Sequence, residues 1–160
     1  MMSASSNGSA TSEPATPKTP VRETPVREIP VRDRLFTLED PPRLLASSCG
    51  GCGQAHFPRG DVCPYCSTEG CGEIELSSSG VLWSWTAVTS APPGYKGEVP
   101  YGFGVVELPE GIRVVTRLSE SDPTRLFYGE RVQMEIVALY KDDEGNDVVT
   151  FSFAPDRAAR

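Results

Sequence analysis

The sequence predicts a mainly β protein with three consecutive parts: a disordered arm, a small cysteine-rich ribbon and a five-stranded barrel. Three observations predict this order. A proline repeat occupies the N-terminal region, two C-x-x-C pairs follow it, and five segments with the composition of strands make up the remainder. The expected boundaries are 1–34 for the arm, 35–72 for a short helix plus the ribbon, and 73–156 for the barrel.

The arm contains the repeat PVRET-PVREI-PVRDR, which starts at Pro20, Pro25 and Pro30. A proline every five residues blocks a regular helix and removes backbone donors. The surrounding composition, rich in Ser, Thr and charge, predicts an extended, disordered segment. This segment is either a solvated tail or a strip whose Val and Arg side chains lie along a partner subunit and order on binding.

A short turn or helix is expected around residues 42–46, before the first cysteine pair. Ten residues separate Cys52 from Cys63, enough for a hairpin that brings the second pair opposite the first. Gly53 suits a tight knuckle, and Pro64 stiffens the other one. Four thiolates fill the tetrahedral coordination of a Zn²⁺ ion and leave no position open for water or a substrate, which is typical of a structural site. The predicted ligands of this rubredoxin-like zinc ribbon are Cys49, Cys52, Cys63 and Cys66.

Other interpretations of the cysteines remain open. The same four sulfurs would accept iron, and CGGC and CPYC resemble redox motifs. His56 or Cys71 could replace one ligand, but we expect His56 to be a half-exposed hairpin residue and Cys71 a free thiol near the end of the ribbon. His56 is the only histidine, so no nucleophilic triad can be assembled and no catalytic residue is assigned.

The barrel is predicted from five alternating segments: residues 80–90, 101–108, 112–118, 131–140 and 148–153. In the first, Val81, Trp83, Trp85 and Ala87 are expected on one face, with Ser84 and Thr86 on the other. Between the third and fourth segments, Asp122 can cap a short helical turn that Pro123 opens and Gly129 ends. Five strands with a helical insert at this point are typical of an OB-fold, with a small β-sandwich as the competing architecture.

The loop SAPPGYKGEVPYGFG, residues 90–104, joins the first two of these strands. In an OB-fold this loop borders the usual ligand face. It is either an ordinary rigid loop or an apolar rim that contacts a ligand or a partner protein. The candidate contact residues are Pro93, Tyr95, Tyr101 and Phe103.

Charge and hydropathy limit the class of protein. With 15 Lys and Arg against 22 Asp and Glu, the formal net charge is −7, which disfavours binding to a phosphate backbone. No apolar run has the length of a membrane span, and the N-terminus lacks the pattern of a secretory signal. We therefore expect a cytoplasmic protein that binds neither nucleic acid nor membrane.

Several motifs together resemble one known family. They are RLLASSCGGCGQAHFPRGDVCPYC, GVLWSWTAV, PPGY, PYGFGVVEL, GIRVVTRL and DPTRLFYGERVQM, which occur in this order over residues 35–155. They look like the family once called domain of unknown function thirty-five, the zinc-ribbon/OB-fold proteins associated with acyl-CoA enzymes. The repeat of the arm is not part of that pattern.

The resemblance implies a function as well as a fold. Members of that family are small non-catalytic subunits of thiolase-superfamily enzymes, of the thiolase or retro-aldolase type, and help to form an acyl-CoA site. This implies a hetero-oligomer, structural Zn²⁺ held by the four cysteines, and acyl-CoA as a ligand shared with the partner, in degradation of aromatic or steroid compounds. The alternatives are a single-stranded nucleic-acid-binding protein and a rubredoxin-like electron carrier.

Overall fold

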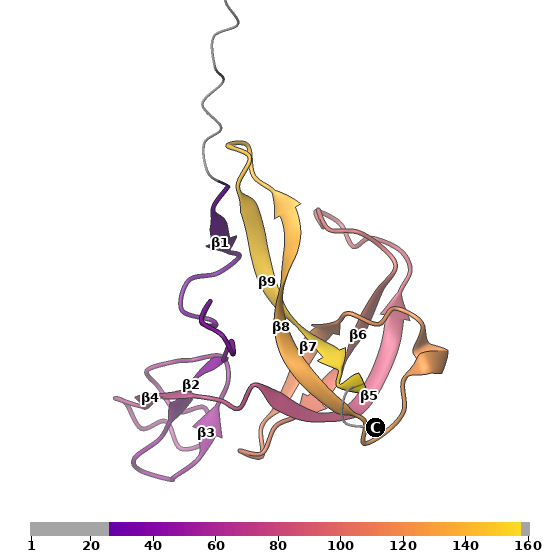
Figure 1. The fold of residues 1–160 in the computed structure, drawn as a ribbon. Helices are drawn as coiled ribbons and strands as arrows, with labels where there is room; N and C mark the ends of the chain where they lie inside the picture. Colours follow the sequence, from indigo (N-terminus) through magenta and orange to yellow (C-terminus); the bar gives the residue numbers. More distant parts are fainter. Residues whose placement is uncertain (1–25, 158–160) are drawn as a thin grey trace, which may run out of the picture.

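The computed structural model describes residues 26–157, which form strands and one short 3-10 helix (Figure 1). Within this range, no helix has the length and apolar character needed to cross a membrane. The elements are β1 (Glu28–Pro30), β2 (Leu45–Ser48), β3 (Ala55–His56), β4 (Gly72–Glu75), β5 (Ser79–Val88), β6 (Tyr101–Glu107), β7 (Arg113–Leu118), η1 (Pro123–Arg125), β8 (Arg131–Lys141) and β9 (Asp147–Pro155).

Strands β5 to β9 close into a barrel in the order β5, β6, β7, β9, β8, with β8 pairing back onto β5. All of these pairings are antiparallel except that of β7 with β9, which is parallel and joins Leu118 to Phe153. A closed five-stranded barrel with the helical turn η1 between its third and fourth strands is the predicted OB-fold. The OB-fold prediction is confirmed, and the β-sandwich alternative is wrong.

The helical turn η1 begins as predicted and ends early. The carboxylate of Asp122 caps it by accepting a hydrogen bond from the Thr124 backbone N–H, and Pro123 is its first residue. The turn finishes at Arg125 and not at Gly129, whose positive φ of 77° serves the later turn into β8.

A β-bulge in β5 overturns the predicted face of this strand. The pairing with β6 slips between Leu82 and Ser84, so that Trp83 is the extra residue. Leu82 is fully buried and Trp83 is 41% exposed. Beyond the bulge, Trp85 lies against the core and its Nε1 donates to the carbonyl oxygen of Pro123. The prediction that Trp83 and Trp85 share a face is wrong, because one inserted residue reverses the alternation.

The predicted short turn or helix around residues 42–46 is also wrong. Leu44 forms a β-bridge with Phe36, and β2 begins at the next residue. Leu44 and Ala46 are completely buried, with one residue between them, which is the spacing of a strand with one face in the core. The pairing of β2 with β4 and burial in the core outweigh the local helix preference of these residues.

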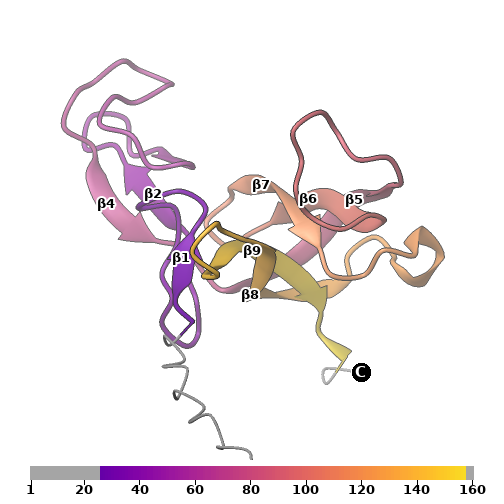
Figure 2. The same ribbon diagram turned by 90° about the horizontal axis from the view of Figure 1, so that it is seen from above.

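The ribbon sheet has the order β3, β2, β4 and lies beside the barrel (Figure 2). One hydrophobic core continues through both parts. Leu44 and Leu76 of the ribbon belong to the same buried cluster as Leu82 and Phe153 of the barrel. The ring of Phe151 on β9 also meets Phe36 and Phe57 edge-on, at centroid distances of 5.9 and 6.1 Å. The ribbon is therefore packed directly on the barrel.

Residues 1–25, most of the predicted arm, lie outside the described residues. For the described remainder, the prediction of disorder is wrong where β1 pairs with the edge of β9 in a parallel register. Pro30 lacks an N–H, but the backbone N–H of Val31 donates to Val149 O at 2.8 Å, and that of Asp147 donates to Arg27 O at 2.9 Å. The exposed edge of β9 supplies the partners that local sequence patterns could not reveal.

Candidate functional site

Two turns of the ribbon, which we call the knuckles, present the cysteines in the same way. In the first, the N–H of Gly53 donates to Cys49 O at 2.8 Å, and in the second the N–H of Ser67 donates to Cys63 O at 2.9 Å. Gly53 has the expected positive φ, 73°, and Ser67 takes a φ of 61° at the matching position. Each knuckle turns the chain so that both cysteines of a pair face the same point.

The four sulfur atoms of Cys49, Cys52, Cys63 and Cys66 lie within 4.8 Å of one another. The Sγ atoms of Cys49 and Cys66 are 3.5 Å apart, and those of Cys52 and Cys63 are 3.6 Å apart, so these contacts join one pair to the other. Zn–S bonds of about 2.3 Å in a tetrahedron require sulfur atoms about 3.8 Å apart, whereas a disulfide requires about 2.05 Å. The cluster therefore fits one tetrahedral metal ion and contains no disulfide.

The electrostatics of the cluster also favour a cation. The backbone N–H of Cys52 is the main cause that lowers the pKa of Cys49 to about 6. The N–H of Gln54 acts in the same direction on Cys52, but the neighbouring sulfurs, led by that of Cys66, together with burial raise the pKa of Cys52 to about 12. Four sulfurs this close cannot all ionise unless a positive charge is placed among them. A divalent ion would supply that charge.

Cys71 and His56 lie outside the sulfur cluster. Cys71 keeps its thiol 3.9 Å from the carbonyl oxygen of Thr68. His56, expected to be half-exposed, is only 8% exposed on β3, where it pairs with Ser47 of β2. Its Nδ1 lies 3.3 Å from Pro58 O, and its Nε2 is buried without a hydrogen-bond partner among the described residues.

The loop between β5 and β6 brings part of the predicted contact set together. Gly94, with a φ of 79°, lets the N–H of Tyr95 bond back to Pro92 O at 3.0 Å. The rings of Tyr95 and Tyr101 then lie 5.2 Å apart. Pro93 remains exposed on the loop.

Strands β6 and β7 supply the last residue of the predicted contact set and one residue that was not predicted. Phe103 follows Tyr101 on the outer side of β6 and is 39% exposed. Arg117 of β7, which the sequence reasoning missed, donates to the Tyr95 hydroxyl and lies 4.5 Å from the Tyr101 ring centroid. The only signal for Arg117 was its place in an alternating strand, and that does not identify its neighbours.

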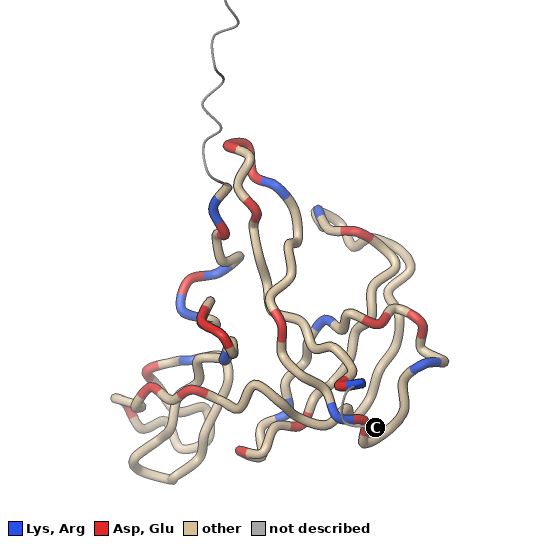
Figure 3. The backbone as a smooth tube through the Cα atoms, viewed as in Figure 1, with Lys and Arg blue, Asp and Glu red and all other residues tan. Residues whose placement is uncertain are grey.

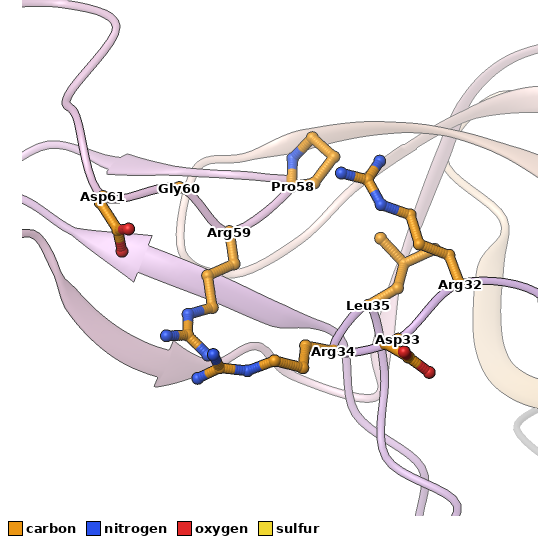
Figure 4. Close-up of a pocket in the computed structure, with 8 residues that line it drawn as sticks. All are labelled: Arg32, Asp33, Arg34, Leu35, Pro58, Arg59, Gly60 and Asp61. Atoms are coloured by element: carbon orange, nitrogen blue, oxygen red, sulfur yellow. The ribbon is translucent and has the colours of Figure 1, made fainter.

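A cavity of about 190 Å³ separates the end of the arm from the loop after β3 (Figure 4). Arg34 and Arg59 extend their guanidinium groups toward one another there, and both pair with the carboxylate of Glu73 on β4. Glu73 neutralises part of the positive charge of the two arginines. Its ion pair with Arg34 links the end of the arm to the ribbon.

Comparison with known proteins finds matches to both parts of the chain. Residues 37–70 match the family model described as the rubredoxin-like zinc ribbon domain of ChsH2, and residues 73–137 match its C-terminal OB-fold domain. A solved structure titled Ltp2-ChsH2(DUF35) aldolase has a TM-score of 0.56 and 28% identity, covering 71% of this chain and 84% of the other.

Two relatives have similar coverage. A DUF35 domain-containing scaffold protein of Methanocaldococcus jannaschii is 30% identical over 112 residues, which is 69% of this chain and 78% of the relative. The benzoylsuccinyl-CoA thiolase subunit BbsA of Thauera aromatica is also 30% identical, over 70% of this chain and 76% of that subunit. With the four-sulfur ribbon and the OB-fold barrel in the same order, the chain belongs to the DUF35 family of zinc-ribbon and OB-fold proteins.

Proposed function

We propose that this protein is a non-catalytic accessory subunit that binds a thiolase-superfamily enzyme of the thiolase or retro-aldolase type. The closed cluster of four sulfurs carries the proposal, because it satisfies a tetrahedral ion completely and leaves no position for a substrate or a reactive water. Cys49, Cys52, Cys63 and Cys66 would hold Zn²⁺, whose part is to keep the ribbon folded. The bond-making groups would belong to the partner.

The relatives support this assignment. One is named a scaffold protein, another is named a subunit of a thiolase, and the similar solved structure is titled Ltp2-ChsH2(DUF35) aldolase. Proteins of this fold are therefore found as parts of thiolase and aldolase assemblies. A role as accessory subunit extends the same arrangement to this chain.

The finer proposal is that the subunit helps to form an acyl-CoA site, in the cytoplasm, in the degradation of aromatic or steroid compounds. Its support is the loop between β5 and β6, which in an OB-fold borders the usual ligand face. Tyr95 and Tyr101 offer apolar rings there, and Arg117 offers a guanidinium group. With Pro93 and Phe103, they are the residues that we propose to contact acyl-CoA or the partner.

Coexpression tests the proposal. Each thiolase-superfamily protein encoded by the source organism is produced together with the tagged chain, beginning with the one whose gene lies nearest. We expect one of them to co-purify in a fixed ratio, one zinc and no iron per accessory chain, and turnover of acyl-CoA only by the complex. If none associates, or if the associated enzyme has full activity without this chain, the proposal is wrong.

A further inference from the structure

The outer surface of β5, β6 and β7 carries an apolar patch that the barrel itself does not need. Strand pairing places Val105 of β6 beside Val115 of β7 and opposite Ser84 of β5, next to the bulge at Trp83. Phe103 lies in the adjacent row. We call Trp83, Phe103, Val105 and Val115 the outer patch.

Three of the four members of the outer patch are exposed, and Val105 between them is half-buried. Val115 is 61% exposed, Trp83 41% and Phe103 39%. The side of an antiparallel sheet that faces water normally carries polar side chains. Neighbouring large apolar groups on that side are typical of a surface that another molecule covers.

Two arginines border the outer patch, and both are held in place. The Arg113 guanidinium lies 4.2 Å from the Trp83 ring centroid, and its Nε is 2.7 Å from a Glu107 carboxylate oxygen. At the other end, Arg117 donates to the Tyr95 hydroxyl and lies over the Tyr101 ring. Aromatic residues and arginine are the types enriched at the centres of protein interfaces, and held side chains lose little entropy on binding.

The surface continues from the barrel to the ribbon. A groove of about 540 Å³ is lined on one side by Glu107 and Arg113 and on the other by Phe57 and Tyr65 of the ribbon. Tyr65, which stands between the two cysteines of the second knuckle, is 64% exposed. A molecule that covers the outer patch and this groove would contact both parts of the chain.

We propose that the outer patch, continued by the groove to Tyr65, is the surface on which the thiolase-like partner subunit docks; this proposal rests on the proposed function. The patch alone, three strands about 4.8 Å apart, offers on the order of 300 Å², whereas a stable interface needs about 800 Å² from each partner. The occupant must therefore be large enough to reach the ribbon. A partner surface that is apolar where it covers Trp83, Phe103 and Val115 is the complement that this face requires.

Other occupants fit less well. The guanidinium groups that border the patch are already engaged, and basic segments alternate with acidic ones along the described chain (Figure 3), so a nucleic-acid backbone finds no basic stripe. A second copy would bring together two chains of net charge −7. Residues 1–25 contain only Met1, Met2 and Val21 as large apolar side chains, too few to cover the patch.

The test uses the full chain and the thiolase-superfamily protein that co-purifies with it. Val115→Glu places a charge at the centre of the patch on a side chain that is already exposed, so the fold should be retained. We expect its Kd for that protein to rise at least about tenfold, with zinc content and Tm unchanged. Trp83→Ala should weaken binding in the same way, and Leu38→Glu, an equivalent change on an exposed loop residue, should not.

The outcomes separate the two proposals. If the wild-type chain binds none of the thiolase-superfamily proteins, the proposed function fails, and this inference fails with it. If the wild type binds and Val115→Glu and Trp83→Ala bind equally well, only the docking surface is wrong. A dimer of the isolated chain that Val115→Glu dissociates, or binding of a fifteen-nucleotide deoxythymidine oligomer that it abolishes, would assign the patch to those occupants and overturn the inference.

Discussion

At the scale of residues, the four cysteines of the sulfur cluster differ in their exposure. Cys49 and Cys63 are 1% exposed, while Cys52 and Cys66 are exposed. The cluster therefore has one side in the protein and one side at the surface. Loss of the sulfur of Cys49 or Cys63 would leave both a vacant ligand position and a buried gap. Substitution of these two cysteines should therefore destabilise the ribbon more than substitution of the exposed pair.

Cys63→Ser should reduce the zinc content from one ion per chain to well below one and should open the ribbon to proteolysis. A hydroxyl is a poor replacement for a thiolate ligand, and in finger peptides zinc contributes roughly 10 kcal/mol or more to folding. Metal analysis and limited proteolysis measure the two effects. Cys71→Ser is the matched control and should retain the ion; loss of zinc in this variant would place Cys71 among the ligands.

Glu120 predicts a pH dependence of stability. The N–H of Asp122, followed by the guanidinium groups of Arg157 and Arg125, holds the pKa of Glu120 below its usual range. Because the folded pKa is lower than the unfolded one, this stabilisation is present above the unfolded pKa of about 4.3 and is lost as pH falls through the folded pKa.

Glu120→Gln should therefore lower Tm at pH 7, by a few degrees at most because ion pairs with exposed arginines contribute little. The difference between variant and wild type should shrink as the pH falls below about 4. Thermal unfolding followed by circular dichroism over this pH range measures it. A difference that stays constant with pH would mean that the charge of Glu120 is not its cause.

At the scale of elements, the barrel depends on close approach between strands. A Cβ on Gly102 of β6 would overlap the backbone oxygen of Glu120 and lie 2.8 Å from the Cβ of Leu118. Gly104, two residues on, would place a Cβ 2.5 Å from Ser84 O. Both glycines are buried on the inner side of β6, where the neighbouring strands leave no room for a side chain.

Gly102→Ala should destabilise the protein by about 1 to 3 kcal/mol, the range found when extra atoms are forced into a packed core. Chemical denaturation measures the change. Gly50→Ala is the control, because a Cβ there would meet no atom within 4 Å, and it should alter stability by less than about 0.5 kcal/mol. Equal effects of the two substitutions would contradict the close approach of β6 to β7.

Strand β1 shows what edge pairing adds at this scale. Ile29 is opposite Val148, yet Val26, Ile29 and Val31 all remain at least 39% exposed. The backbone hydrogen bonds to β9 therefore hold this segment more than hydrophobic burial does, and the exposed ion pair of Arg34 with Glu73 adds little.

At the scale of the whole molecule, the continuous core joins the stability of the ribbon to that of the barrel. Phe36, Leu44 and Leu76 are buried in the same cluster as the interior of the barrel. If the ribbon opens, the sides of these residues that face the barrel become exposed. The ribbon and the barrel are thus expected to unfold together.

Removal of zinc with a strong chelator should lower the Tm of the whole chain by about 10 °C or more and should leave a single unfolding transition. Far-ultraviolet circular dichroism and tryptophan fluorescence, which follows Trp83 and Trp85 in the barrel, should report the same midpoint. A barrel transition that does not move on chelation would show that the two parts are energetically independent. Restoring zinc should restore the midpoint.

Features that depend on residues close together in the chain could be predicted from the sequence alone. Two C-x-x-C pairs ten residues apart, the knuckle at Gly53, a capping Asp122 and the alternation of most barrel strands follow from ligand chemistry and local backbone geometry. The tertiary structure was needed to establish the reversed face of β5, the strand in place of a turn or helix at β2, and the pairing of β1 with β9. It also placed Arg117 over the ring of Tyr101 and brought the residues of the outer patch next to one another on neighbouring strands. Each of these depends on which strands become neighbours, and local sequence does not carry that information because the partners lie far apart in the chain.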